Sequence, residues 1–404
     1  MKAESIILSG PSGVGKSTVS NKLSDHYDFQ IVQSVTTRDK RSDDRNGRYE
    51  YIDKSDYEKL KEDDELLIWA EYRNEYYGIR KSEYNSVLNS GDNPILVITA
   101  ESAVECIIEN EYIEEERFLS IFIDSSDEEL NSRLENRDGD VDAEESRRRD
   151  GDRKFKRKFI YQLQNRKIDD TIDTIRILWK YCDRSGILPR EYIESLINCG
   201  TLIKKNADMD SVSHASYDLS VGDEYYHSGE IQQLDTYDPY ITIEPYDYAI
   251  VMSKETVSFP RDIAGRFDLT VGLFCQGVIL SNGPQIDPGF EGRLFCLLFN
   301  TSDGKVQLGR GDKYATLETR KLLAPTDPYE GSYQGKEHIQ DYLPDLRMQG
   351  AISQLKEEID QMKEEREKLQ QVVFTRNITI ALGFISFILA LIAILVALFS
   401  SSGL

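Results

Sequence analysis

The sequence predicts a multidomain protein with an α/β domain, an all-β domain, a coiled coil and one transmembrane helix, in that order. Three observations lead to this prediction. Strand-like apolar runs alternate with polar helical stretches over residues 1–182, and short runs punctuated by proline and glycine follow over residues 186–323. Apolar residues then fall at heptad spacing and finally in one uninterrupted run. The 404 residues also exceed what one hydrophobic core usually serves.

The overall composition narrows the function classes. The formal net charge of −23 argues against general nucleic-acid binding, because the phosphate backbone would repel such a chain. The five cysteines show no C-x-x-C spacing, so the sequence suggests neither a zinc site nor a disulfide framework. The N-terminus lacks the long apolar segment of a signal peptide, which favours a reducing cytosol for the bulk of the chain.

The α/β domain opens with a strand and a phosphate-binding loop. Three short β-rich runs, Ser5–Leu8, Pro94–Thr99 and Leu119–Ile123, are typical of a buried parallel sheet. The first run leads into G-x-x-x-x-G-K-S, whose glycines let backbone N–H groups converge on phosphates. In such a loop the lysine meets the β/γ-phosphate charge and the serine hydroxyl can bind Mg²⁺. The predicted cofactor-binding residues are Gly10, Ser12, Gly13, Gly15, Lys16, Ser17 and Thr18, with Ser17 as the metal ligand.

The sequence around this loop resembles guanylate kinase over about residues 3–180. The resemblance rests on IILSGPSGVGKSTV, SVTTRDKR (34–41), NGRYEY (46–51), WAEYRNEYYG (69–78) and RLENR (133–137). It implies ATP and Mg²⁺ as cofactors and a nucleoside monophosphate as phosphoryl acceptor, a reaction in which arginines and Mg²⁺ neutralise the transferring charge. By this resemblance the acceptor phosphate is bound by Ser34, Arg38, Arg41, Tyr49 and Tyr77. The implied catalytic residues are Lys16, Arg38, Arg133 and Arg137, together with an arginine among 147–149.

The chain departs from that family where the base would be read. Ile68 stands in place of the glutamate that reads the guanine edge, and Ile79 in place of a serine or threonine. Val97 and Thr99 replace two aspartates. Since an apolar side chain cannot accept from a guanine N–H, discrimination for guanine should be lost. Two interpretations stay open, a nucleotide-binding pseudokinase and a kinase for a different monophosphate.

A strongly basic stretch follows the predicted lid motif. Eight of the twelve residues 147–158 are lysine or arginine. They could bind phosphate, form a patch for anionic lipid or make a solvated face. We expect two or three of them in the phosphate role.

The second domain carries short runs such as Ala249–Met252, Gly277–Leu280 and Leu294–Phe299. Motifs along residues 186–336 resemble the dCTP deaminase/dUTPase family. They are GILPREYIESLINCGTLI, HASYDLSVG, SFPRDIAGRF, QIDPGFEG and the tail SYQG. The resemblance implies a distorted β-barrel or jelly roll that works as a homotrimer, with sites between subunits.

Catalytic residues of this second family are largely missing. Thr270-Val271-Gly272 and Cys275 align with its phosphate-binding serines and arginines, and Leu297 with the deaminase glutamate. Leucine cannot act as a general base, so we expect deaminase activity to be lost. Asp287 survives where dUTPases hold a water-activating aspartate, and it is our predicted substrate-binding residue in this domain. Asp-Pro-Gly is also an ordinary tight-turn sequence, so a structural role stays open.

The end of the chain predicts membrane attachment. Residues 324–347 are expected to form an extended tail, and 348–373 a coiled coil, with apolar residues at Met348, Ile352, Leu355, Ile359, Met362, Leu369 and Val373. Residues 378–399 provide 22 positions without a charge, enough to span a bilayer of ~30 Å. Lys368 and Arg376 flank only the upstream end, which predicts a single-pass C-terminal anchor with the bulk of the chain cytoplasmic.

These features predict a membrane-anchored, nucleotide-binding homotrimer. Its P-loop domain resembles a nucleoside-monophosphate kinase that is not specific for GMP, and it is coupled to a degenerate dCTP deaminase/dUTPase-like domain. The alternative is a catalytically inactive nucleotide sensor or membrane effector, for example in bacterial phage defence.

Overall fold

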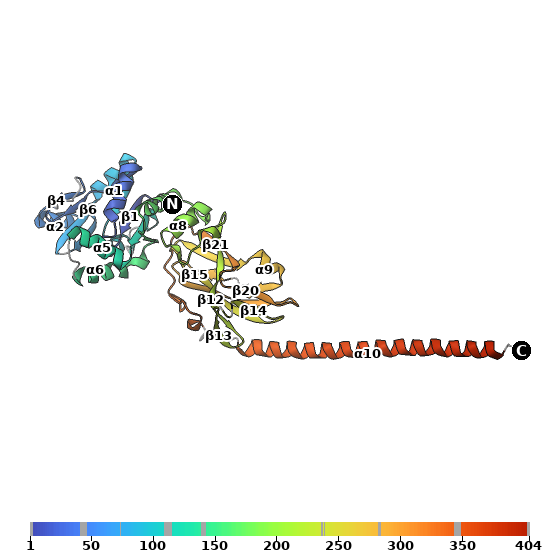
Figure 1. Ribbon diagram of the computed structural model, residues 1–404. Coiled ribbons are helices and arrows are strands. Elements are labelled where there is room, and N and C mark those ends of the chain that lie inside the picture. The colour runs from blue at the N-terminus through green and yellow to red at the C-terminus, as the bar shows by residue number, and fades with distance from the viewer. Residues whose placement is uncertain are drawn as a thin grey trace.

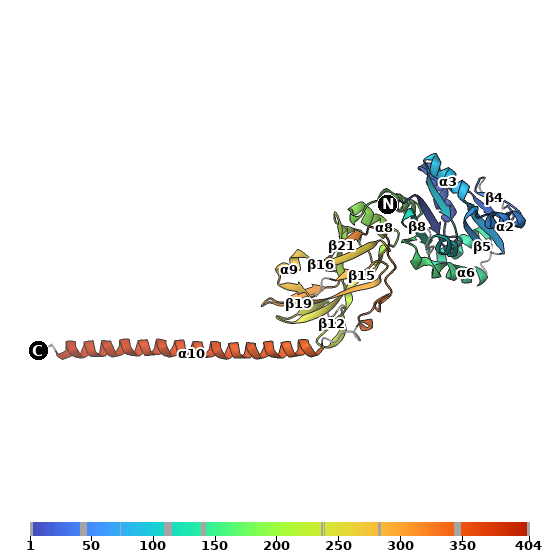
Figure 2. The same cartoon turned by 180° about the vertical axis from the view of Figure 1, so that it is seen from behind.

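The N-terminal domain is built on a parallel sheet with the strand order β2-β7-β1-β8-β9. The computed structural model describes residues 3–40, 47–72, 74–108, 115–138, 143–235, 237, 239–281, 284–342 and 349–401. The strands are β1 (Ser5–Ser9), β2 (Phe29–Ile31), β7 (Asn93–Val97), β8 (Phe118–Asp124) and β9 (Tyr161–Gln164). The three β-rich runs expected from the sequence correspond to β1, β7 and β8, of which β1 is labelled in Figure 1 and β8 in Figure 2.

Helices cover both faces of this sheet. Side chains alternate along each strand, so each strand directs apolar residues to the helices on both faces. Ile6 and Leu8 of β1 pack in one apolar cluster with residues of α1 and α7, whereas Ile7 packs in a second cluster with residues of α3 and α4. The helices of this domain are α1 (Lys16–His26), α2 (Lys54–Glu62), α3 (Lys81–Ser90), α4 (Ala100–Ala103), α5 (Asp127–Asp138), α6 (Ala143–Lys154) and α7 (Ile168–Lys180). A second sheet, of order β4-β3-β6-β5, comprises β3 (Ser34–Thr36), β4 (Tyr49–Tyr51), β5 (Leu66–Tyr72) and β6 (Glu75–Arg80).

The second domain is β-rich and antiparallel. Its main sheet follows the path β17-β19-β15-β12-β21-β16-β18, with β10, β11 and β13 paired beside it, while β14 and β20 form a separate ribbon. The main-sheet strands are β10 (Gly186–Ile187), β11 (Leu202–Lys205), β12 (Ser216–His227), β13 (Glu230–Gln233), β15 (Tyr248–Ser258), β16 (Ile263–Leu269), β17 (Val278–Leu280), β18 (Gln285–Ile286), β19 (Glu291–Asn300) and β21 (Lys313–Lys321). The ribbon strands are β14 (Tyr240–Ile243) and β20 (Val306–Gly309), and the helices are α8 (Arg190–Asn198) and α9 (Val271–Cys275).

The two domains share one apolar cluster. Residues of β1, α7, α8 and the large antiparallel sheet all belong to it. At the junction the Tyr161 hydroxyl of β9 donates to the buried carboxylate of Asp262 at 2.8 Å and lies 2.7 Å from the Tyr192 hydroxyl of α8. Thr174 of α7 donates to the carbonyl of Ser195 at 2.9 Å. The sequence patterns predicted two domains, and the structure adds that they pack as one unit.

The chain ends in a single helix, α10 (Gln349–Ser401). Figures 1 and 2 show it projecting away from the β-rich domain as one continuous rod. Within it, the segment Gln361–Ile392 is long and apolar enough to cross a membrane. Met362, Leu369 and Val373, three of the residues at heptad spacing, are exposed in the single chain.

Candidate functional site

The loop between β1 and α1 has the backbone shape of a phosphate cradle. Gly10, Gly13 and Gly15 adopt φ values of 137°, 81° and 100°, a region that favours glycine. A Cβ on Gly10 would lie 2.0 Å from the Ile123 carbonyl oxygen of β8, so no other residue fits there. Helix α1 starts after Gly15 without a side-chain cap, and its first N–H groups can therefore bind an anion.

Lys16 lies over this loop. Its Nζ donates to the carbonyls of Gly10 at 2.5 Å and Pro11 at 2.8 Å. Asn165, which follows β9, donates to the Val14 carbonyl at 2.7 Å, and this hydrogen bond holds the phosphate-binding loop in place. Arg133 of α5 donates to the same carbonyl at 3.3 Å and to that of Asn165 at 3.1 Å. The structure thus places Arg133 against the loop backbone.

A cavity of about 220 Å³ joins the loop to the second sheet. It brings together predicted residues from both sides, namely Gly10, Ser12, Lys16, Ser17, Ser34, Arg38, Tyr49 and Tyr77. Arg38 is buried, and its guanidinium lies 4.7 Å from the centroid of the Tyr49 ring. Gly13, Gly15, Thr18 and Arg133 do not line the cavity, and Arg41 and the side chain of Arg137 lie outside the described part of the structure.

One wall of the cavity is apolar. Ile68 and Ile79, which face each other across β5 and β6, are 2% and 1% exposed, and Ala70, Val97 and Ile98 continue the wall. The polar groups here are the hydroxyls of Thr99 and Ser102, which are 2.6 Å apart. Thr99 also caps α4 by accepting from the Ser102 N–H. The four departures noted in the sequence therefore lie at one cavity.

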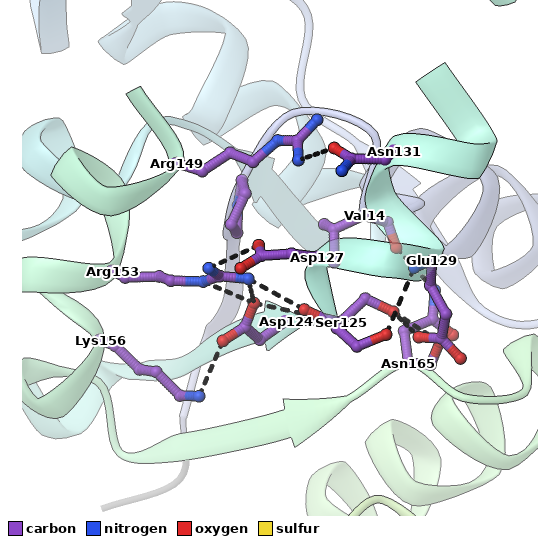
Figure 3. A network of polar contacts seen from close by, with 12 residues as sticks. Val14, Asp124, Ser125, Asp127, Glu129, Asn131, Arg149, Arg153, Lys156 and Asn165 are labelled. Carbon is purple, nitrogen blue, oxygen red and sulfur yellow. Dashed lines mark hydrogen bonds and ion pairs between the residues drawn. The ribbon is translucent and has the colours of Figure 1, made fainter. Parts of the chain in front are cut away.

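Within the basic stretch 147–158, Figure 3 shows three cations that bind partners outside the stretch, namely Arg149, Arg153 and Lys156. Arg153 and Lys156 both bind the carboxylate of Asp124, at 3.2 Å and 2.9 Å. Although burial alone would raise the pKa of Asp124, these two cations hold that pKa below its usual value. Arg157 donates to the Tyr329 carbonyl at 2.5 Å, in the tail of the β-rich domain. Arg153, Lys156 and Arg157 thus have partners elsewhere in the fold.

Arg149 is the member of the predicted arginine group 147–149 whose side chain the structure describes. Its side chain is 2% exposed, and Nη1 donates to Asn131 at 2.6 Å (Figure 3). Its Nε and Nη2 atoms are buried and have no hydrogen-bond partner among the described residues. Such a guanidinium is suited to an anion that enters from outside the chain.

Asp287 lies in a different place, beside a cavity of about 460 Å³ in the β-rich domain. It accepts from Gln285 at 2.8 Å and begins the Asp-Pro-Gly turn. A Cβ on Gly289, which has φ 76°, would lie 2.6 Å from the Cα of Pro328, so the turn and the tail are tightly packed. Tyr333 and Tyr342 of the tail pack on Phe295 at the same cavity. The structure therefore brings Asp287 together with the tail.

Leu297, the position aligned with the second family's catalytic glutamate, lies in apolar surroundings, whereas the positions on α9 are exposed. Leu297 packs with Tyr226, Ile250, Met252, Ile339 and Tyr342 in a separate apolar cluster. On α9, Val271 and Phe274 are exposed, as is the Cys275 thiol.

Sequence reasoning missed Arg48. It lines the first cavity beside Ser34, Arg38 and Tyr49, although it belongs to none of the quoted phosphate-binding positions. The signal that could have found it is its place in NGRYEY, one residue before Tyr49.

Comparisons with known proteins divide the chain in the same way. The family model described as guanylate kinase matches residues 2–181, and the one described as dCTP deaminase-like matches residues 187–322. The dCTP deaminase of Thermococcus kodakarensis is 38% identical over 132 residues, which cover 32% of this chain and 83% of the relative. The guanylate kinase of Mycoplasma genitalium is 34% identical over 177 residues, which cover 42% of this chain and 72% of the relative. The N-terminal part of this chain belongs to the guanylate kinase family, and the β-rich part that follows belongs to the dCTP deaminase-like family.

Proposed function

We propose that this chain is a membrane-anchored nucleotide-binding protein whose P-loop domain transfers a phosphoryl group from ATP to a nucleoside monophosphate other than GMP. The observation that carries the proposal is the single cavity in which Lys16 and the loop meet Ser34, Arg38, Tyr49 and an apolar base wall. The β-rich domain serves as a degenerate nucleotide-binding partner. The chain's resemblance to named kinases and deaminases supports nucleotides as its ligands.

The chain's own residues supply binding and charge neutralisation. Backbone N–H groups of the loop and the Lys16 ammonium hold the triphosphate. Ser34, Arg38, Arg41, Tyr49 and Tyr77 hold the acceptor phosphate, and Arg133, Arg137 and Arg149 offset the charge of the transferring group. The Ser17 hydroxyl would be the protein's ligand to Mg²⁺. One hydroxyl fits this ion, because Mg²⁺ in such sites takes few protein ligands beside substrate phosphates and water. When bound, Mg²⁺ would polarise the phosphates.

Acceptor choice tests this proposal. With Ile68 and Ile79 against the base, the N–H donors of guanine would be buried without partners, at a cost of about 1–3 kcal/mol each. In the presence of ATP and Mg²⁺, we expect AMP, CMP, UMP or dTMP to be phosphorylated at least about tenfold faster than GMP. Nucleotide chromatography measures the diphosphates formed. Efficient formation of GDP from GMP would overturn the proposed specificity.

The second candidate is an inactive nucleotide sensor or membrane effector, of the kind that could serve in phage defence. Val97 and Thr99 favour it, because the Thr99 hydroxyl is occupied by Ser102 where the family has a carboxylate. Its signature would be retained ATP binding with no turnover of any common ribo- or deoxyribonucleoside monophosphate.

Loss of deaminase activity is a further expected result. Leu297 lies in an apolar cluster and cannot move a proton to an attacking water, so no dUTP should form from dCTP above the uncatalysed background. Chromatography of dCTP incubated with the full chain measures this. Production of dUTP that Asp287→Ala abolishes would show that Asp287 is a catalytic residue.

We also expect a parallel homotrimer. Apolar residues of the heptad positions, such as Met362 and Leu369, are exposed on the single helix α10 and need partner helices to bury them. Mass photometry of a chain that ends at Arg376, or cross-linking of the full chain in nanodiscs, should give three subunits. A monomer at micromolar concentration would contradict this expectation.

A further inference from the structure

The acceptor side of the first cavity contains a cation that no motif assigns, Arg48. It precedes β4, and its carbonyl accepts the Ser34 N–H at 3.2 Å, so the two residues are neighbours in the cavity lining. Its Nη1 atom is buried and has no hydrogen-bond partner among the described residues. A buried N–H donor without an acceptor costs free energy, and a bound ligand that accepts its hydrogen bond removes that cost.

Arg48 also adds positive charge to a region that already contains one guanidinium. The Arg48 guanidinium lies 5.5 Å from the centroid of the Tyr49 ring, and that of Arg38 lies 4.7 Å from the same centroid. Glu50, a carboxylate two residues away, is bound to Arg80 at 3.0 Å. Lys16 and the carboxylate of Asp152 line the same cavity, so its lining carries three cations against one carboxylate, a balance that favours an anion with several acceptor oxygens.

At the opposite end of the cavity, the polar groups are the hydroxyls of Thr99 and Ser102, which lie 2.6 Å from each other. Its wall of Ile68, Ala70, Ile79 and Val97 can contact a base only through apolar surface. Binding free energy for the acceptor must therefore come mainly from its phosphate.

We infer that Arg48 is a further ligand of the acceptor phosphate, and that the site takes nucleoside monophosphate dianions chiefly through this group. The inference rests on the proposed function and names the part of the acceptor that the site recognises. Because a free nucleoside lacks the dianion, it should neither bind measurably nor compete.

Isothermal titration of the full chain in detergent tests this inference, with AMP, CMP, UMP and dTMP as probes and the corresponding nucleosides beside them. For the tightest monophosphate, Arg48→Gln should weaken binding about ten- to a hundredfold, the loss typical of one charged hydrogen bond. Arg48→Lys should recover part of the affinity, and ATP affinity should not change. Arg176→Gln removes the same charge from an exposed ion pair with Asp173 and serves as the control.

A pH series separates phosphate binding from a structural role. The second ionisation of a phosphate monoester has a pKa of about 6, so wild-type affinity should fall as the pH drops through that value. In Arg48→Gln this fall should be shallower. Unchanged affinity in Arg48→Gln would overturn the role of Arg48 and leave the proposed function intact. Failure of the wild-type chain to bind any of the four monophosphates would overturn both.

Discussion

Replacing Lys16 by alanine is expected to weaken ATP binding by about ten- to a hundredfold, equivalent to the loss of a charged hydrogen bond of roughly 1.5–3 kcal/mol. The ammonium lies directly over the loop, within hydrogen-bond distance of the Gly10 and Pro11 carbonyls. A triphosphate in the cradle would bring its β- and γ-phosphates to this charge. Titration of ATP into the wild-type and variant chains measures the effect.

Lys22→Ala is a matched control for this change. Lys22 lies on the same helix, but its ammonium pairs with the exposed carboxylate of Asp169 at 2.9 Å. Removing it should leave ATP affinity within about a factor of two, because exposed pairs contribute little. The expected loss of ATP affinity in Lys16→Ala is the same for an active kinase and for an inactive sensor, since both bind the triphosphate at this loop. Equal ATP affinity in the Lys16 variant and wild type would mean that triphosphate does not bind at this loop.

The features that sequence predicted correctly are local ones. A run such as SIILS followed by the glycine loop specifies a buried strand and a cradle through its own residues, and both are present at β1 and Gly10. The departures at Ile68 and Ile79 could also be identified from the sequence, because each isoleucine stands in place of a polar residue within or beside a recognisable motif. The structure then places both at one cavity wall.

Features that depend on distant partners could not be predicted. The basic stretch was open to three interpretations because nothing near it in sequence identifies Asp124 as the partner of Arg153 and Lys156. Arg48 was missed although it directly precedes Tyr49, since its significance comes from a buried Nη1 atom and from the charge of Arg38 near it. Patterns of residue type record periodicity and motifs, whereas these contacts arise from how helices, strands and loops pack in space.

The domain junction is the clearest case of such a contact. Arg261 belongs to the β-rich domain, and its side chain is 5% exposed. Its guanidinium binds the Glu115 carboxylate at 2.7 Å and 3.1 Å and donates to the Thr326 carbonyl of the tail at 2.7 Å. It also donates to the Lys158 carbonyl, at the end of the basic stretch. One side chain thus joins the P-loop domain, the β-rich domain and the tail.

Arg261→Met is therefore expected to lower the free energy of unfolding by about 3–5 kcal/mol, because Glu115, whose side chain is 18% exposed, loses the guanidinium that binds its carboxylate at 2.7 Å. Urea unfolding of the full chain in detergent, followed by fluorescence and circular dichroism, measures the loss. The same change at Arg320, whose ion pair with Glu318 is exposed, should cost less than about 1 kcal/mol.

The double variant Arg261→Met/Glu115→Leu distinguishes the ion pair from simple packing. If the loss of the ion pair between Arg261 and Glu115 causes the effect, removing the carboxylate as well should restore part of the stability, since apolar residues often replace a buried pair at little cost. The junction should also determine cooperativity. Wild type should unfold its two domains in one transition because they share a core, and Arg261→Met should separate the transition into two. A single transition at the wild-type urea concentration would show that Arg261 does not hold the domains together.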